Sequence, residues 1–287
     1  MPTLADVITV LDRLYPPDTA ADWDAVGPVC GDPSAAVRTV LFAVDPVRSV
    51  VDQALAIGAD LLVTHHPLFL RGTSTVYAGT TKGRLVHRLV TGGCALVAVH
   101  TNADVAVGGV SAALAAALGL SAATALVPAA GPGTGFGRVG DLATAMSLRD
   151  FVAHVAAALP STPAGVRAAG DLDRMVARVA VSGGAGDSHL AAATSSGADA
   201  YVTADLRHHY ATDHLEAGGP ALVDPGHWAS EWPWLPVAAK ALADALASDH
   251  DDGDTVRIQV SEQVTDPWTV HDRRHTGPQG PEQGSER

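Results

Sequence analysis

The sequence predicts an α/β protein with two α/β domains whose sheets are mixed and largely parallel. Short apolar runs alternate with longer amphipathic segments along most of the 287 residues, which is typical of βαβ units. A stretch rich in proline and glycine, residues 127–140, interrupts the alternation and predicts a domain boundary. The alternation then resumes, so we expect a second α/β unit after it.

The first half of the chain has the clearest alternation. Residues 39–44 and 61–63 are continuous apolar runs, which predict buried strands. Between them, residues 49–57 predict a helix that ends at Gly58, since glycine commonly follows a helix. Further along we expect a helix over 82–90, a strand over 95–99 and a helix over 109–118.

The second half repeats the pattern with shorter strands. We expect a helix over 148–159 that Pro160 stops, and a strand over 255–260 with one wetter face. The remaining expected elements are strands over 178–181, 200–203 and 221–223, a helix from Ser188 and a helix over 235–247. From about residue 270 the chain is polar and nearly free of apolar residues, which predicts a disordered tail.

The composition excludes several classes of function. The formal net charge is −13, so we expect no direct binding to nucleic acid or anionic lipid, where basic residues form the contacts. Two cysteines, Cys30 and Cys94, cannot form a disulfide framework or a thiolate zinc site. The uncharged stretch 105–137 is too weakly apolar for a membrane span, and the first residues lack a basic signal-peptide start. The expected location is therefore the cytoplasm, with no membrane contact.

Three polar clusters each follow a predicted strand. His65 and His66 come after 61–63 and before Pro67, which cannot continue a central strand. The second cluster, residues 100–104, follows 95–99, and the third, residues 226–231, follows 221–223. Because the carboxyl ends of parallel strands lie at one edge of a sheet, the three clusters can converge on one crevice.

These clusters contain candidate metal ligands. Adjacent histidines on an extended chain point in different directions and can address two ions, and residues four apart on a helix share a face. The candidate ligands are His65, His66, Asp104, His227 and Glu231. Imidazole and carboxylate suit zinc, manganese, iron or a similar divalent ion. Five ligands are too many for one open catalytic zinc but enough for two ions that share a carboxylate.

Each cluster alone also has an ordinary explanation. A histidine pair in a loop can be a surface feature, and Asp104 can simply be near the start of a helix. His227 and Glu231 can form an exposed pair on a helix. What favours a metal site is that all three clusters follow strand ends.

The motifs resemble those of a known family. THHPL at 64–68, HTNAD at 100–104 and GHWASE at 226–231 are similar to the signature motifs of the GTP cyclohydrolase I type 2 homolog family, also called Nif-three-like or YbgI-like. Supporting matches are ADWD at 21–24, SGGAG at 182–186, GADAY at 197–201 and TDP at 265–267. They occur in the family's order, and the similarity covers about residues 1–268.

The resemblance implies a Nif-three-like fold, toroidal homohexamers and a dinuclear metal site in the cleft between the two domains. His65, Asp104 and Glu231 would hold one ion, and His66, His227 and Glu231 would hold the other. We assign residues 1–126 and 221–268 to a discontinuous metal-binding domain, 127–220 to the second domain and 269–287 to the tail. The short 127–140 stretch leaves no room for the middle domain of longer members.

Two further segments have less certain roles. Residues 205–209 follow the predicted strand 200–203, and His209 best matches a recurrent histidine of the family. We predict a proton-transfer or substrate-contact role for His209, with a capping or supporting role as the alternative. Ala204 departs from the family's usual glycine here, as Trp228 and Ser230 depart from its usual Tyr and Thr. The glycine-rich segment 183–186 is predicted to cradle a phosphate or to form a plain tight turn.

The leading functional hypothesis is a metal-dependent hydrolase that acts on a nucleotide-like small molecule. The family name suggests GTP cyclohydrolase-type opening of a purine ring, although the motifs specify metal ions and not a base. The alternative is a non-enzymatic metal-binding or regulatory scaffold protein. A transcription-linked interaction protein is a third hypothesis, which the acidic charge does not support through DNA contact.

Overall fold

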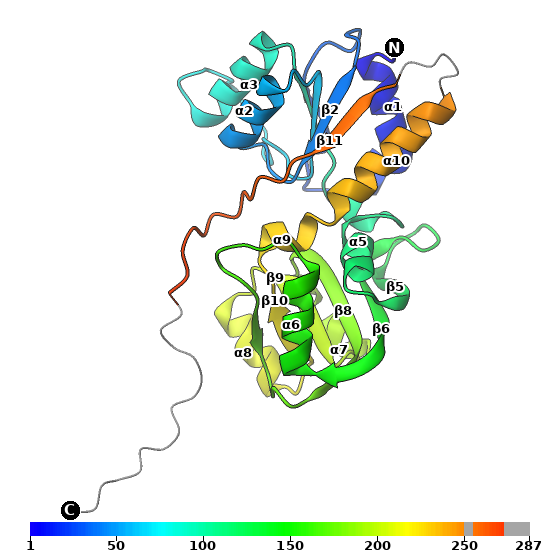
Figure 1. Ribbon diagram of the computed structural model, residues 1–287, viewed down its shortest axis with the longest axis vertical. Coiled ribbons are helices and arrows are strands. Elements are labelled where there is room, and N and C mark those ends of the chain that lie inside the picture. The colour runs from blue at the N-terminus through cyan, green and yellow to red at the C-terminus, as the bar shows by residue number, and fades with distance from the viewer. Residues whose placement is uncertain (250–254, 273–287) are drawn as a thin grey trace, which may run out of the picture.

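The structure is a computed structural model that describes residues 1–249 and 255–272, and it contains two sheets, each with helices on both faces (Figure 1). The expected α/β fold with two mixed sheets is therefore confirmed. Residues 269–272 contain no helix or strand, and the rest of the predicted tail, 273–287, lies outside the described residues. Within the described ranges, no helix has both the length and the apolar content needed to cross a membrane.

The first sheet has the order β1-β4-β3-β2-β11. All its neighbouring strands run parallel except β1, which is antiparallel to β4. Its strands are β1 (Gly27–Cys30), β2 (Thr39–Ala43), β3 (Leu61–Thr64), β4 (Ala95–Ala98) and β11 (Arg257–Val260). The expected central strands are present because their continuous apolar runs are buried on both faces.

Alternate residues of these strands pack into two separate cores. Val40 and Phe42 point to one face and Leu41 and Ala43 to the other, as the strand period of two requires. The helices α1 (Leu4–Leu14) and α10 (Trp234–Asp249) pack on the first face. The helices α2 (Arg48–Ala56) and α3 (Thr81–Thr91) pack on the second.

The second sheet has the order β5-β6-β8-β9-β10-β7 and contains both parallel and antiparallel pairs. Its strands are β5 (Ser121–Pro128), β6 (Gly135–Ser147), β7 (Arg167–Ala169), β8 (Met175–Ala185), β9 (Ala200–Ala204) and β10 (Ala221–Asp224). The helix α6 (Leu148–Ala158) packs on one face, and α7 (Leu190–Ser195) and α8 (His208–Glu216) pack on the other.

One helix, α5 (Val110–Ala117), belongs to both cores. Its Val110 and Ala113 pack with the first sheet, whereas Leu114 packs with the second. Figure 1 shows this helix at the junction between the two sheets. The short helices α4 (Thr101–Val105) and α9 (His227–Glu231) follow β4 and β10 and carry two of the polar clusters.

Two features of the predicted chain division differ from the structure. The Pro/Gly-rich stretch 127–140 contains the end of β5, the turn of an antiparallel hairpin and the first residues of β6, and both strands lie in the second sheet. The strand β10, which the predicted division assigns to the first domain, pairs with β9 and β7 of the second sheet. A short apolar run predicts a strand without identifying its partner. The rest of the domain division stays a prediction.

Candidate metal centre

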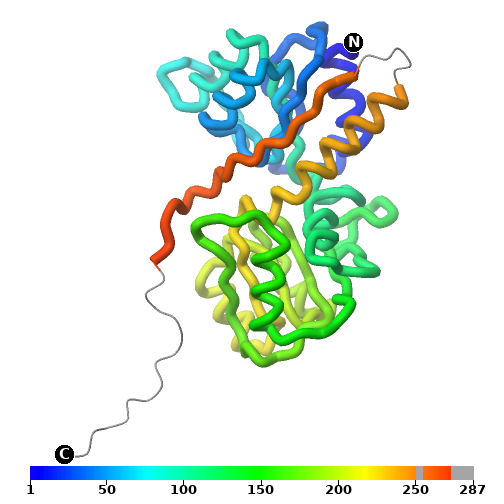
Figure 2. Tube along the Cα trace, viewed as in Figure 1, coloured from blue at the N-terminus to red at the C-terminus, as the bar shows by residue number. Residues whose placement is uncertain are grey.

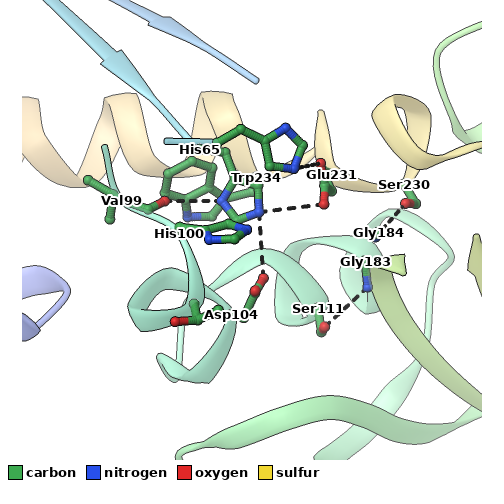
Figure 3. Close-up of polar contacts among 12 residues, drawn as sticks. His65, Val99, His100, Asp104, Ser111, Gly183, Gly184, Ser230, Glu231 and Trp234 are labelled. Carbon is green, nitrogen blue, oxygen red and sulfur yellow. Dashed lines mark hydrogen bonds and ion pairs between the residues drawn. The ribbon is translucent and has the colours of Figure 1, made fainter. Parts of the chain in front are cut away.

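The carboxylate of Glu231 lies among three histidines that come from both sheets. Its Oε1 is 2.9 Å from His227 Nε2 and 3.5 Å from His65 Nε2, and its Oε2 is 3.3 Å from His66 Nε2. Asp104 Oδ1 is 3.7 Å from the same nitrogen, His65 Nε2. Figure 3 shows His65 between Glu231 and Asp104. The fold therefore brings all five sequence-predicted ligand residues together.

The strand ends explain this convergence. His65 and His66 directly follow β3, and Asp104 lies on α4, which begins just after β4. His227 and Glu231 are the first and last residues of α9, so their side chains lie on one face of that helix. Parallel β3 and β4 end at the same edge of the first sheet, and α9 meets that edge from the second.

A hydrogen bond at Nδ1 fixes the orientation of each predicted histidine ligand. His65 Nδ1 donates to the Val99 carbonyl oxygen at 3.0 Å. His66 Nδ1 donates to Asp45 at 2.7 Å, and His227 Nδ1 donates to Asp205 at 2.7 Å. In the neutral form of each ring the proton lies on Nδ1, which leaves the Nε2 lone pair on the Glu231 side of the ring for a metal ion. Metal-binding histidines typically have this arrangement.

Two buried atoms of the cluster have no hydrogen-bond partner among the described residues, namely His65 Nε2 and Glu231 Oε2. The two residues are only 1% and 3% exposed, so water does not compensate them freely. Two ligands about 2.1 Å from one zinc ion at tetrahedral angles lie roughly 3.4 Å apart, close to the separations around Glu231. The donor set, the spacing and the orphaned atoms all fit a divalent metal ion.

When no metal ion is bound, protons on the histidines balance the negative charge of the carboxylates at this site. Burial opposes the charged form of His66, but the carboxylates of Glu231 and Asp45 raise its pKa to about 10. Glu231 and Asp205 raise the pKa of His227 to about 11. Burial disfavours the Glu231 carboxylate, but the surrounding imidazoles hold its pKa well below the usual range. Burial raises the pKa of Asp104 to about 6. An ion that binds here displaces protons.

The glycine-rich segment 183–186 forms a wall of this site. Gly183 and Gly184 lie in β8, where the Gly184 amide donates to Ser230 Oγ at 2.8 Å and the Gly183 amide donates to Ser111 Oγ at 3.3 Å. Because serine hydroxyls already accept from these amides, the segment is not a free phosphate cradle. Its glycines instead allow α9 to approach β8 closely, which neither predicted role had included.

Comparison with known proteins identifies the family of this chain. A family model described as Duf34/NIF3 (NGG1p interacting factor 3) matches residues 2–267. This chain belongs to the Duf34/NIF3 family. A GTP cyclohydrolase 1 type 2 homolog from Streptomyces coelicolor is 50% identical over 274 residues, which cover 94% of this chain and 95% of that protein. One from Mycobacterium tuberculosis is 37% identical over an alignment of 374 residues, so it contains a segment that this chain lacks.

Solved structures share the fold of this Duf34/NIF3 chain. The crystal structure of a Bacillus cereus protein related to NIF3 matches with a TM-score of 0.87 and 25% identity, over 94% of this chain and 99% of that one. The Staphylococcus aureus protein SA1388 matches with a TM-score of 0.82 and 28% identity, over 94% of this chain and all of that one. The predicted family membership is confirmed.

The ligands predicted from the sequence of this Duf34/NIF3 chain omit a fourth imidazole, His100, which lies in the second polar cluster. Its Nδ1 donates to Asp24 at 2.8 Å, and its ring lies 5.1 Å from the ring of His65 (Figure 3). Ring nitrogens of His65, His66 and His100 lie within 4.8 Å of one another, close enough to share an ion. The available signal was the position of His100, four residues before Asp104 and just after β4.

The other predicted site residue, His209, lies elsewhere. It is exposed in the first turn of α8, where its ring contacts that of His208 at 5.2 Å. His209 does not contact the candidate metal centre, and its catalytic role stays a prediction. Within the same 205–209 segment, Asp205 is the residue that reaches the site, through the hydrogen bond that orients His227.

Replacing Asp205 by asparagine is expected to weaken metal binding without loss of the fold. Asp205 has a φ of 55°, and asparagine tolerates this left-handed conformation better than most residues. The amide removes the negative charge behind His227, so we expect metal affinity to fall about 10–100-fold. Competition with a metal chelator measures this. Asp141→Asn, which alters an exposed ion pair with Arg178, is the control. Equal affinities of the two variants would contradict the assigned role.

Proposed function

We propose that this protein binds two divalent metal ions that share Glu231. The proposal is carried by one observation, that a single buried carboxylate reaches three imidazoles whose Nε2 atoms all face it. His65 and Asp104 complete one set of ligands, and His66 and His227 complete the other. Imidazole and carboxylate donors suit zinc, manganese or iron.

We further propose that the protein is a hydrolase of a nucleotide-like small molecule, with GTP cyclohydrolase-type ring opening as one candidate reaction. Bound ions at such a site lower the pKa of a coordinated water and polarise the bond under attack. Asp45, Asp205 and the Val99 carbonyl hold the three ligand imidazoles in place by hydrogen bonds. The names of the curated relatives support this reaction class.

A panel of nucleotides and phosphoesters, incubated with the metal-loaded protein, tests this hydrolase. We expect turnover of at least one nucleotide-like compound, and loss of that turnover in Glu231→Ala. A metal-loaded protein that converts none of the panel would contradict the hydrolase. If Glu231→Ala keeps the turnover, the reaction does not depend on the metal centre.

The alternative function is a non-enzymatic metal-binding or regulatory scaffold. The family description, which names an interaction and no reaction, favours this alternative. It predicts bound metal that exchanges with free metal and no turnover on the same panel. Measuring exchange beside activity distinguishes the two functions. For either one we expect a cytoplasmic location, as the composition predicts, and toroidal homohexamers, as the sequence resemblance implies.

A further inference from the structure

A cavity of about 640 Å³ opens beside the candidate metal centre, and His66 and His227 form part of its wall. Small-molecule sites in proteins commonly have volumes of about 300–1,000 Å³. Much of the rest of the wall comes from residues at and just before the start of β7 and from the segment that follows β11. We call this segment, residues 261–272, the C-terminal strap. Figure 2 shows it leaving the first sheet as an extended chain.

The strap is tied to the metal centre by side-chain hydrogen bonds. The Thr265 hydroxyl donates to Asp45, and the other oxygen of Asp45 accepts from His66 Nδ1. One residue further on, Asp266 is only 9% exposed, and its Oδ1 accepts from the Trp268 amide at 3.0 Å. These contacts fix the position of Trp268 relative to the predicted ligand His66.

Trp268 and Arg167 present unused binding groups to the cavity. The Trp268 side chain lines the cavity yet is 67% exposed, so much of its ring is free to contact a ligand. The Arg167 guanidinium donates to Asp224 at 2.6 and 3.0 Å, which fixes its direction. Its side chain remains 77% exposed, and a guanidinium has five N–H donors, so others remain available to a ligand.

The charge of the lining argues against a polyanionic ligand. Four carboxylates line the cavity against one guanidinium, those of Asp45, Asp205, Asp224 and Asp266. Two divalent ions at Glu231 and the Arg167 guanidinium would together carry fewer positive charges than the negative charges on Glu231, Asp104 and the four lining carboxylates. A triphosphate chain inside this cavity would lie among like charges, which is unfavourable.

We propose that the cavity binds an uncharged heteroaromatic ring, such as the base of a nucleoside, stacked on Trp268 and hydrogen-bonded at its polar edge by Arg167. This inference rests on the proposed function, because it places the ring of the substrate beside the metal ions. Any phosphate groups extend out of the cavity and add little to affinity. Trp268 and Arg167 thus determine which class of compound the site accepts.

Calorimetric titration of the full-length, metal-loaded protein tests this inference. The probes are guanosine, adenosine and cytidine, compared with inorganic triphosphate. Stacking of a base on an aromatic side chain is worth about 1–3 kcal/mol, so Trp268→Ala is expected to weaken nucleoside binding roughly 5–150-fold. Trp268→Phe keeps an aromatic face and is expected to retain most of the affinity. Tyr77→Ala removes another exposed aromatic side chain outside the lining and is the control.

The outcomes separate this inference from the proposed hydrolase. Metal content that is equal in all variants shows that the centre is intact. Nucleoside binding that depends on Trp268, together with no turnover on the nucleotide and phosphoester panel, would support the cavity and contradict the hydrolase. The inference is overturned if none of the nucleosides binds, if inorganic triphosphate binds as tightly as they do, or if Trp268→Ala binds them as the unaltered protein does.

Discussion

Glu231→Ala is expected to lose both of the proposed metal ions, whereas Asp104→Ala and His227→Ala are each expected to lose mainly one. The difference follows from the position of Glu231, whose two oxygens reach His65, His66 and His227. Loss of a residue that merely supports a ligand costs about 10–100-fold in metal affinity, and loss of a shared ligand is expected to cost more. Elemental analysis of the purified variants gives the stoichiometry directly.

The comparison also tests whether the fold survives. Glu231 lies among three imidazoles, so its removal takes away one of the two carboxylates that contact His66 and one of the two that contact His227. Glu231→Gln keeps the side-chain volume and provides a second variant if Glu231→Ala is poorly folded. Retention of one ion per chain in both Glu231 variants would contradict the shared carboxylate.

Gly184→Ala is expected to disrupt the metal centre from the neighbouring strand. Gly184 has a φ of +64°, and a Cβ atom there would lie 2.3 Å from Glu231 Oε1 and 2.9 Å from His227 Nε2. The methyl group must displace two predicted ligands, and the backbone conformation is also unfavourable for alanine. We expect a loss of about 2–5 kcal/mol in the free energy of unfolding and at least roughly tenfold weaker metal binding.

Gly197→Ala is the matched control for this variant. Gly197 has a similar φ of +72°, but nothing lies within 4 Å of the added Cβ atom. It therefore incurs only the backbone cost, about 1–2 kcal/mol, and metal binding should be unchanged. Denaturant unfolding and chelator competition on both variants separate strain from displacement of the ligands. Equal metal affinities of Gly184→Ala and Gly197→Ala would show that the centre tolerates the extra methyl group.

The sequence predicted the centre of the fold and the convergence of the ligands for one physical reason. Strands that are buried on both faces, such as β3 and β4, appear as uninterrupted apolar runs, so the polar residues that end them are conspicuous. His65, His66 and Asp104 could be located in this way. The hairpin of β5 and β6 was missed because Ser121–Pro128 is largely exposed and its Pro/Gly-rich turn resembles a linker.

The supporting residues were harder to predict. Asp45 and Asp205 are, respectively, 21 residues before His66 and 22 residues before His227, the histidines that they orient. No local spacing links an acceptor to a histidine when the two meet only through the packing of separate strands. Asp24, which orients His100, lies 76 residues away from it. Pairings of this kind require the tertiary structure.

The helix α5 contributes Val110 to one core and the neighbouring turn's Leu114 to the other. Neither half of the chain can therefore be excised with a complete interior, because each would lose part of its packing or expose an apolar helix face. The two sheets are joined by this shared helix as well as by the polypeptide linkers, which favours a single cooperative unfolding transition. A recombinant fragment that contains only one sheet would need its exposed face of α5 redesigned before it could fold.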